Sequence, residues 1–266
     1  MPESPNIHPS AVVDPSAQLA PDVRVGAFSI VEPGVQIERG STVAEHAIVR
    51  SGVRLGVDCV VDSFVVLGGQ PQMRGSGLLQ RNVRIGDRSI LREGVTVGQP
   101  VKDGGETVVG ADCYLMANSH VGHDCRVGDA VTLANNVMLA GHVAVGGGSF
   151  LGGGAGIHQF VRVGRLAMVG GNASISYDVP PFAMAAERNE IRGLNFVGLR
   201  RQRISHDVLA DLKRAYHAVY SGPGDFRQRA ECAIAEGRFC PDSAAHEFLA
   251  FFVGGKRGFA RARRCQ

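Results

Sequence analysis

The sequence predicts a mainly β protein, a left-handed parallel β-helix of hexapeptide repeats followed by a C-terminal α-helical domain. Three observations lead to this prediction. An aliphatic residue recurs at every sixth position over most of the chain, 36 of the 266 residues are Gly while none is Trp, and the period stops after Val179. The Gly share is about twice the usual ~7%. Gly is neither every third residue nor accompanied by abundant Pro, which excludes collagen.

The six-residue period covers three stretches of the chain. Its aliphatic positions are Ile7, Val13, Leu19, Val25, Val31, Ile37, Val43, Val49, Leu55, Val61 and Leu67, then Ile85, Leu91 and Val97, and then every sixth residue from Val109 to Ile175. A period of six fits neither an α-helix nor a plain alternating strand. It is typical of parallel β-helices, in which short strands alternate with turns.

Three hexads make one triangular coil of about 18 residues, and its narrow interior has little space for Trp. Residues 69–84 and 98–108 interrupt the period and are rich in Gly and polar residues. We predict that they are loops extruded from a β-helix that spans residues 1–190.

Helical signals replace the period after Val179. Ser205 is placed to cap a helix that runs to Tyr220, before the helix-breaking sequence at 222–224. Further helices are expected over residues 226–235 and 242–253. Residues 191–266 are therefore predicted to form the helical domain.

The net charge of +3 is unevenly distributed along the chain. Residues 191–266 hold 14 Lys and Arg against 7 Asp and Glu, a net charge of +7, whereas residues 1–190 hold 14 against 18, a net charge of −4. A basic segment attracts nucleic acid, anionic lipid, phosphorylated small molecules or an acidic protein, and charge alone does not select among them.

The cysteine pattern and the absence of a leader indicate a cytoplasmic protein. The six cysteines form no Cys-x-x-Cys pair, so we expect reduced thiols. No basic region followed by an apolar run opens the chain, and we expect no signal peptide. Residues 130–161 lack charged side chains, but their Gly, Asn and His content and the six-residue period argue against an integral membrane segment.

Four of the nine histidines lie within one stretch of 39 residues: His120, His123, His142 and His158. The 18-residue coil places His123, Gly141 and Gln159 in one column on successive coils, roughly 4.8 Å apart. The same spacing places Asp124 beneath His142 in the neighbouring column. The sequence therefore predicts a cluster of polar groups along one edge of the coil.

These residue types suit acyl transfer. A neutral His123 can act as a general base, and Asp124 can fix its tautomer and stabilise the imidazolium. A Gly at 141 lets a substrate approach a backbone N–H that can stabilise an oxyanion. No Ser or Cys is clearly paired with His123, so we expect direct transfer without an acyl-enzyme.

A metal site is the alternative interpretation of the histidine cluster. Three His can hold Zn²⁺, and the γ-class carbonic anhydrases, which also have hexapeptide repeats, use a His trio at a subunit boundary. The His120-x-x-His123 spacing differs from the four-residue gap usual in that family. We therefore expect neither a metal nor another cofactor.

The chain resembles the UDP-N-acetylglucosamine O-acyltransferases of lipid A biosynthesis along nearly its whole length. The stretches that carry the resemblance are residues 118–125 (NSHVGHDC), 133–136 (LANN), 139–143 (LAGHV), 157–160 (IHQF), 178–182 (DVPPF) and 193–201 (GLNFVGLRR). The resemblance implies a cytoplasmic homotrimer with sites between subunits. It also implies acyl carrier protein as the acidic donor, which the basic tail suits, and no nucleic-acid partner.

The resemblance also implies residue roles. His123 would be the general base toward the sugar 3-hydroxyl, Asp124 its orienting partner, and Gly141 the donor of the oxyanion hole. The sugar and acyl site would be lined by His120, His142 and Gln159. The nucleotide end would be held by Asn195 and Arg201.

Two loops depart from the pattern of that family. Where the family usually has Pro-Gln-Asp-Leu-Lys-Tyr, this chain has Pro-Gln-Met-Arg-Gly at 71–75, which leaves Gln72 and Arg74 as substrate-binding candidates. After residue 97 it has Gly-Gln-Pro-Val in place of His or Asn followed by Arg-Gly-Thr. Three alternatives therefore remain. The acceptor could be another nucleotide sugar, such as a 3-amino sugar, the donor could be coenzyme A, or the protein could be a non-catalytic scaffold.

Overall fold

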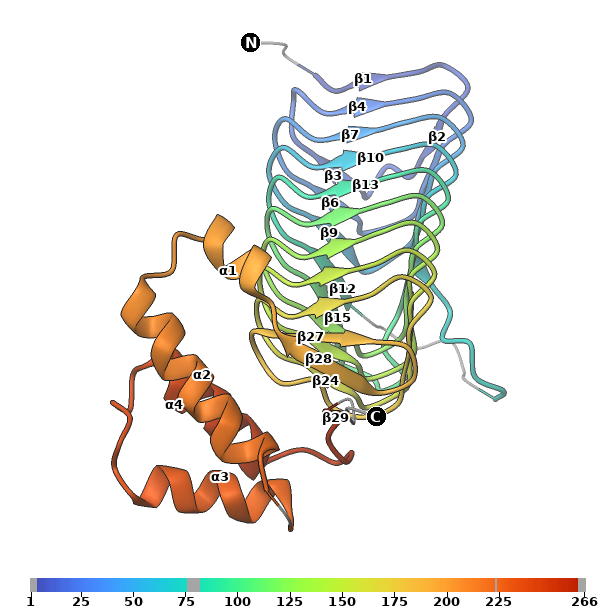
Figure 1. Ribbon diagram of the computed structural model, residues 1–266. Coiled ribbons are helices and arrows are strands. Elements are labelled where there is room, and N and C mark those ends of the chain that lie inside the picture. Colours follow the sequence, from blue (N-terminus) through green and yellow to red (C-terminus); the bar gives the residue numbers. More distant parts are fainter. Residues whose placement is uncertain (1–3, 76–81, 223, 263–266) are drawn as a thin grey trace.

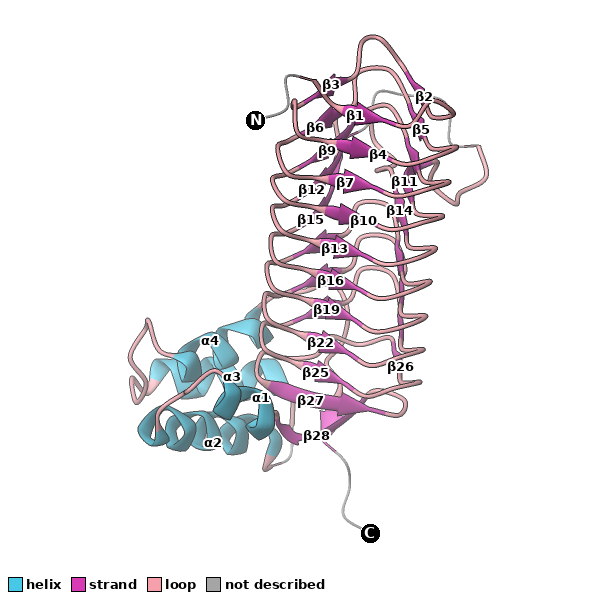
Figure 2. Cartoon of the chain, turned by 90° about the horizontal axis from the view of Figure 1, so that it is seen from above, coloured by secondary structure: helices cyan, strands magenta, loops and turns pink. Residues whose placement is uncertain are grey.

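The computed structural model describes residues 4–75, 82–222 and 224–262, and it confirms the predicted fold class (Figure 1). Short strands of successive coils stack into three sheets, which form the faces of a triangular left-handed β-helix. Four α-helices in the described residues lie beside the C-terminal coils (Figure 2).

We name the three sheets A, B and C. Sheet A contains β1 (Asn6–Ile7), β4 (Arg24–Val25), β7 (Thr42–Val43), β10 (Val60–Val61), β13 (Ile90–Leu91), β16 (Tyr114–Leu115), β19 (Thr132–Leu133), β22 (Phe150–Leu151), β25 (Met168–Val169), β27 (Ala183–Ala186), β28 (Glu190–Leu194) and β29 (Arg261–Ala262). Sheet B contains β2 (Val12–Val13), β5 (Ile30–Val31), β8 (Ile48–Val49), β11 (Val66–Gly69), β14 (Thr96–Gly98), β17 (His120–Val121), β20 (Met138–Leu139), β23 (Gly156–Ile157) and β26 (Ser174–Ile175). Sheet C contains β3 (Gln18–Leu19), β6 (Gln36–Ile37), β9 (Val53–Leu55), β12 (Asn82–Ile85), β15 (Glu106–Val109), β18 (Arg126–Val127), β21 (Ala144–Val145) and β24 (Arg162–Val163).

Parallel pairing keeps the hexad positions in register from coil to coil. Leu133 pairs with Leu151, which is 18 residues later. The pairing continues across both interruptions, where Val61 pairs with Leu91 and Val97 with Val121. The extra residues are therefore extruded without shifting the inward-facing side chains.

Both extrusions leave the coil at the edge between sheets B and C. The strands extend further than predicted, because β11 and β14 run through Gly69 and Gly98, which pair with each other. β12 begins at Asn82 and β15 at Glu106. The two loops are thus shorter than 69–84 and 98–108, and residues 76–81 of the first lie outside the described residues.

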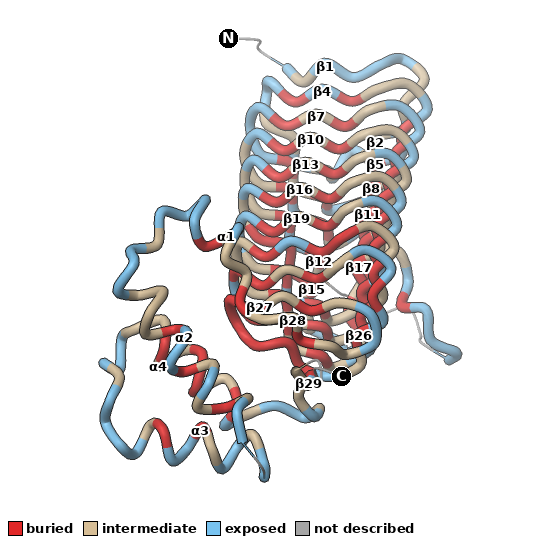
Figure 3. Tube along the Cα trace, viewed as in Figure 1, coloured by how far each residue is buried: buried red, intermediate tan, exposed pale blue. Residues whose placement is uncertain are grey.

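The core is a continuous column of aliphatic side chains inside the coil. Figure 3 shows that buried residues, in red, recur at the same place on successive coils. Leu67, Leu91 and Leu133 are fully buried there. Ile7 is 39% exposed, because no coil covers the N-terminal end. Among the described residues, the fully buried aromatic side chains, Phe182, Phe248 and Phe252, lie instead in a second core that involves the helices.

The helices are α1 (Phe196–Arg201), α2 (His206–Tyr220), α3 (Phe226–Ala235) and α4 (Ala244–Ala250), and a 3-10 turn (Phe251–Val253) continues α4. Ser205 caps α2 as predicted, because its side chain accepts a hydrogen bond from the Val208 N–H. The bounds predicted for α3 are confirmed. The six-residue α1 was not predicted. None of the helices in the described part of the chain is long and apolar enough to cross a bilayer.

The segment predicted to form the helical domain, residues 191–266, also contains a strand near each of its ends. β28 pairs antiparallel with β27, and β29 pairs with β28. The first helix begins only after Asn195, because Gly193 has a φ of +132° that no helix accommodates. These two strands extend sheet A past residue 190 and cover an edge that the last coil would leave open.

Candidate active site

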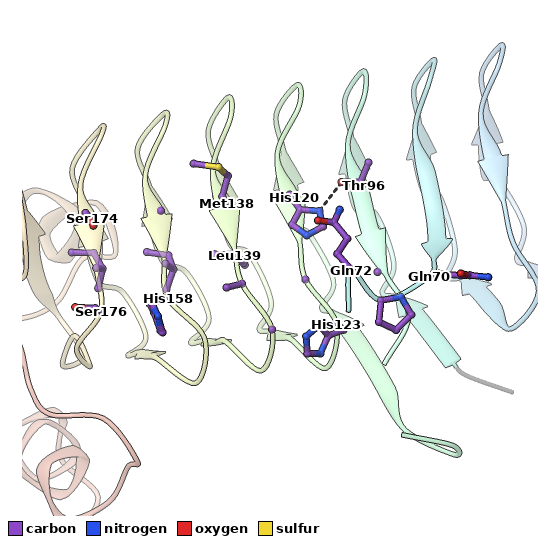
Figure 4. A pocket seen from close by; sticks show the side chains of 18 of the residues that line it. Gln70, Gln72, Thr96, His120, His123, Met138, Leu139, His158, Ser174 and Ser176 are labelled. Carbon is purple, nitrogen blue, oxygen red and sulfur yellow. Dashed lines mark hydrogen bonds between the residues drawn. The ribbon is translucent and has the colours of Figure 1, made fainter. Parts of the chain in front are cut away.

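A groove of about 800 Å³ follows the outer face of sheet B toward its edge with sheet C. Gln72 of the first loop and Thr96 lie at one end, and His123 lies near the middle. Ser176 and Arg188 line the other end. Figure 4 shows that the polar side chains come from successive coils, as the 18-residue spacing predicts.

The His123 imidazole is hydrogen-bonded to the neighbouring Asp124 carboxylate. Nδ1 of His123 lies 2.8 Å from Oδ2 of Asp124, and both side chains are about 15% exposed. An ionised carboxylate only accepts hydrogen bonds, so Nδ1 carries the proton. In the neutral ring, Nε2 is then unprotonated and its lone pair can accept a proton, as a general base requires.

Two hydrogen bonds hold Asp124 in place, one with a backbone N–H of the second extruded loop and one with the Thr107 side chain of β15. The Val101 N–H donates to Oδ2 of Asp124 at 3.0 Å, and the Asp124 N–H donates to Oγ1 of Thr107 at 2.9 Å. Asp124 has a φ of +58°, as turn residues at the coil edges often do here. Loop 99–105 therefore fixes the carboxylate that orients His123.

Gly141 lies directly against the His123 ring. A Cβ atom at residue 141 would lie 2.9 Å from Cδ2 of His123, and it would overlap with Cε1 and Nε2. Among the described residues, the Gly141 N–H has no hydrogen-bond acceptor. The next coil therefore presents a bare backbone beside the His123 ring, where only Gly fits.

His120 begins β17, three residues before His123, and lines the groove. Its Nδ1 is 2.7 Å from Oγ1 of Thr96. Burial lowers the pKa of His120, and the nearby His123 lowers it further. The ring is therefore neutral at pH 7 and available for hydrogen bonding to a substrate.

His142 stacks at the same edge, above Asp124. Its ring lies 5.0 Å from His123 in an edge-to-face arrangement and 4.6 Å from Phe160 in a parallel stack. Burial lowers the pKa of His142, although Asp124, whose Oδ2 is 3.8 Å from Nε2, acts in the opposite direction. Burial has the larger effect, so His142 is also neutral at pH 7.

The residues that could together hold a metal differ from the three histidines of the metal hypothesis. His123, Asp124 and His142 each offer one ligand atom within 4.8 Å of the others. However, Oδ2 of Asp124 already accepts hydrogen bonds from His123 and from the Val101 N–H. This donor set favours a hydrogen-bonded pair over a metal centre.

Asp124 and His142 contact His123 but do not themselves line this groove, and four other predicted residues do not line it within one chain either. Arg74 and Gln159 are exposed, and only the backbone oxygen of Gln159 makes a described contact. The Asn195 side chain accepts from the Gly198 N–H and donates to the Leu166 carbonyl, so it caps α1. Arg201 is exposed at the end of α1.

The groove and its surroundings also contain residues to which the sequence analysis assigned no role. His158 and Ser176 line it from the two coils beyond Ala140, and their 18-residue spacing was a usable signal. Arg188 and the Val101 N–H had no such signal, because both lie outside the repeat. Arg257 contacts His158 and Gln159 from the C-terminal segment, where no periodic pattern predicts a contact.

A hexapeptide coil with this histidine–carboxylate pair beside a bare glycine defines the class of hexapeptide-repeat acyltransferases. Residues 106–141 match the model of the bacterial transferase hexapeptide (six repeats). Residues 178–260 match domain 2 of the UDP-N-acetylglucosamine O-acyltransferase model.

Whole-chain comparisons agree with these matches. An acyl-[acyl-carrier-protein]–UDP-N-acetylglucosamine O-acyltransferase of Rhizobium johnstonii is 40% identical over 93% of this chain and 92% of its own length. One of Syntrophobacter fumaroxidans is 38% identical over 96% of this chain and 99% of its own. The chain belongs to the UDP-N-acetylglucosamine O-acyltransferase family.

Solved structures of that family have the same fold. The enzyme of Acinetobacter baumannii superimposes with a TM-score of 0.91 at 31% identity, covering 96% of this chain and 99% of that one. The enzyme of Campylobacter jejuni gives a TM-score of 0.89 at 33% identity, covering 97% and 100%.

Proposed function

We propose that this protein transfers a 3-hydroxyacyl chain from acyl carrier protein to the 3-position of UDP-N-acetylglucosamine, the first step of lipid A biosynthesis. The observation that carries the proposal is the His123–Asp124 hydrogen bond beside Gly141, in a groove large enough for an acyl chain. The relatives from Rhizobium johnstonii and Syntrophobacter fumaroxidans are named for this reaction.

In the proposed reaction, His123 is the general base. Nε2 accepts the proton of the sugar 3-hydroxyl while the hydroxyl oxygen forms a bond to the thioester carbonyl carbon. The carbon–sulfur bond then breaks, and the imidazolium returns the proton to the thiolate of the donor. Asp124 keeps Nδ1 protonated and stabilises the transient imidazolium. The step balances without a nucleophilic side chain.

The oxyanion of the tetrahedral intermediate is assigned to the Gly141 N–H. That N–H has no acceptor among the described residues, and the missing side chain leaves it accessible beside His123. A backbone donor of this kind is worth ~3 kcal/mol in transition-state stabilisation. Neutral His120 and His142 supply further hydrogen bonds around the sugar without adding charge.

The acceptor is open between a 3-hydroxyl and a 3-amino sugar nucleotide. Gln70, Pro71 and Gln72 of the first loop line the groove, as does Gly98 at the start of the second. Pro71 and Gln72 match the family pattern, and the departing Arg74 does not line the groove. Gly98 stands where the family usually has His or Asn and does line it, so this departure lies where an acceptor would bind. Competition between the two UDP-sugars decides this point, because an ester product is cleaved by mild alkali and an amide is not.

The donor is assigned to acyl carrier protein because residues 191–266 carry a net charge of +7 and that donor is acidic. Steering between opposite charges weakens with salt. We expect kcat/KM for the carrier-bound donor to fall as NaCl rises from 50 to about 500 mM, while a neutral thioester such as an acyl-pantetheine shows little change. Equal salt dependence of the two would favour a small thioester donor, with coenzyme A as the next candidate.

We further propose a homotrimer in the cytoplasm. Apolar side chains on the outer faces of the coil are exposed in the single chain, among them Val12 and Met138 of sheet B and Phe28 and Phe64 at the edge between sheets A and B. A neighbouring coil would cover them and close the groove, and it would bring Arg201 of α1 to the nucleotide end. Free thiols at the five described cysteines accord with the cytoplasm.

The decisive experiment offers the protein several acyl carrier protein thioesters together with several UDP-sugars, and mass spectrometry identifies the product. We expect a 3-O-acylated UDP-N-acetylglucosamine that disappears in His123→Ala and persists in the exposed control His8→Ala. An N-acylated product would identify the 3-amino acceptor. If none of the donor and acceptor pairs gives a product, catalysis is refuted and the scaffold alternative is supported.

A further inference from the structure

The C-terminal segment contacts the groove through one arginine. Nη2 of Arg257 lies 3.0 Å from Nδ1 of His158, and Nε of Arg257 donates to the Gln159 carbonyl at 3.0 Å. Arg257 is 99 residues away from His158 in the sequence. Two nitrogens of the Arg257 guanidinium therefore contact two neighbouring residues of one coil.

The chemistry of Arg257 fixes the protonation pattern of the His158 ring. A guanidinium has five N–H donors and no acceptor, and it stays charged in proteins. Nδ1 of His158 also lies 3.3 Å from the Gln159 carbonyl oxygen, which can only accept, but its contact with Arg257 is the shorter at 3.0 Å. Nδ1 therefore accepts from Arg257, and the proton of the neutral ring lies on Nε2. His123 has the opposite tautomer, because its Nδ1 donates to Asp124. One groove thus contains one imidazole that is set to accept a proton and another that is set to donate a hydrogen bond.

The segment that carries Arg257 is anchored on both sides. Before it, Nη2 of Arg162 donates to the carbonyls of Phe251 and Gly254 at 2.9 and 2.8 Å. After it, the buried Asp178 N–H donates to the Gly258 carbonyl, and the Ala260 N–H donates to the Asp178 carbonyl. These backbone contacts hold Arg257 in reach of His158 before a substrate binds.

We propose that Arg257 is a positioning residue for acyl transfer, which holds His158 in the tautomer whose Nε2–H donates into the groove to a substrate oxygen. His158 lines the groove, and its ring lies along the same edge as His123 in Figure 4. The two rings are two coils apart, roughly 10 Å. An oxygen at that distance from the reacting carbonyl belongs to a phosphate of the nucleotide sugar or to an amide of the donor's pantetheine arm.

This inference rests on the proposed function, but its first test does not require turnover. Histidine ¹⁵N NMR separates the two neutral tautomers, and the His158 signals are assigned by their loss in His158→Gln. We expect the Nε2–H form in the native protein and a mixture of tautomers in Arg257→Met. The control is Arg261→Met, which removes an exposed arginine of the same segment and leaves the pattern unchanged.

The kinetic test measures KM for each substrate separately. We expect Arg257→Met to raise KM for one of the two substrates about tenfold, the effect of one lost hydrogen bond, with kcat changed less than twofold. The substrate affected identifies the oxygen, as phosphate or pantetheine amide. Arg257→Lys, which retains one charged donor, should recover part of the loss.

A double-mutant cycle separates positioning from direct binding. The amide nitrogen of Gln at 158 donates without a tautomer, so Arg257→Met should have little further effect in the His158→Gln background. An undiminished tenfold effect there would show that Arg257 binds substrate itself, and an unchanged NMR pattern in Arg257→Met would show that it does not set the tautomer. Either result overturns the proposal. Failure of acyl transfer alone would refute the proposed function and leave the NMR result to decide the inference.

Discussion

Replacement of Gly141 by Ala tests the geometry of the proposed active site with a single methyl group. The added Cβ would overlap with Cε1 and Nε2 of His123, so the ring must move by about 1 Å to reach van der Waals contact. Such a shift breaks the alignment of the 2.8 Å hydrogen bond to Asp124 and moves Nε2 away from the sugar hydroxyl. A misplacement of ~1 Å at a catalytic group costs about 10²-fold in rate.

We therefore expect kcat of acyl transfer to fall by about a hundredfold in Gly141→Ala, as measured by steady-state release of free acyl carrier protein. The fold should persist, because Gly141 does not have the positive φ that disfavours Ala. Gly153→Ala is the matched control, since it occupies the corresponding turn position at another edge and its Cβ would approach only the Asn135 carbonyl at 3.3 Å. A Gly141→Ala enzyme with kcat within threefold of the native value would refute the assignment of His123 and Gly141 to the reacting centre.

Three further predictions follow from the same contacts. His123→Ala should lower kcat by about 10²–10⁴-fold while the oligomer seen by light scattering persists, and near-native turnover would exclude His123 as the base. Burial lowers the pKa of His120 in the folded protein below its ordinary value near 6.5, so at a pH near or below 6.5 the unfolded chain binds more protons at this histidine than the folded protein does. The free energy of unfolding should therefore fall as the pH drops through about 6.5 toward the lower pKa of the folded protein. His120→Gln should accordingly show a smaller fall in Tm between about pH 7.5 and 5.5 than the native protein does. Arg162→Met leaves the fully buried Asp178 carboxylate without its 2.7 Å partner, which should reduce the free energy of unfolding by about 3–5 kcal/mol in urea, whereas Arg165→Met, at an exposed ion pair, should cost under about 1 kcal/mol.

The opposing influences on Asp178 explain why that ion pair matters. Burial raises the pKa of the Asp178 carboxyl, although the Arg162 side chain and backbone N–H both act to lower it. Burial has the larger effect on the pKa, so the charged form of the Asp178 carboxyl depends on the hydrogen bonds that it accepts from Arg162. The same pair joins the last coils to the C-terminal segment, because Arg162 also donates to two carbonyls there.

The repeat made much of the site predictable from the sequence. Because each coil adds a constant number of residues, the sequence predicts that His123 and Gly141 lie on adjacent coils, and Gly141 lies against the His123 ring. The same arithmetic placed Asp124 beneath His142, whose Nε2 lies 3.8 Å from the carboxylate. Gln159 occupies its predicted column too, but the register does not determine where an exposed side chain points, and this one does not line the groove.

The sequence by itself determined the coil, the edge on which the histidines meet, and the bounds of α3, since periodic burial and helix signals are local and repeat along the chain. Only the tertiary structure decided that the Val101 N–H holds Asp124, that β28 and β29 close sheet A, and that Arg257 reaches His158. These contacts join segments outside the repeat to segments within it. No period relates their positions, so they are fixed only when the loops and the C-terminal segment pack against the completed coil and satisfy its remaining hydrogen-bonding groups.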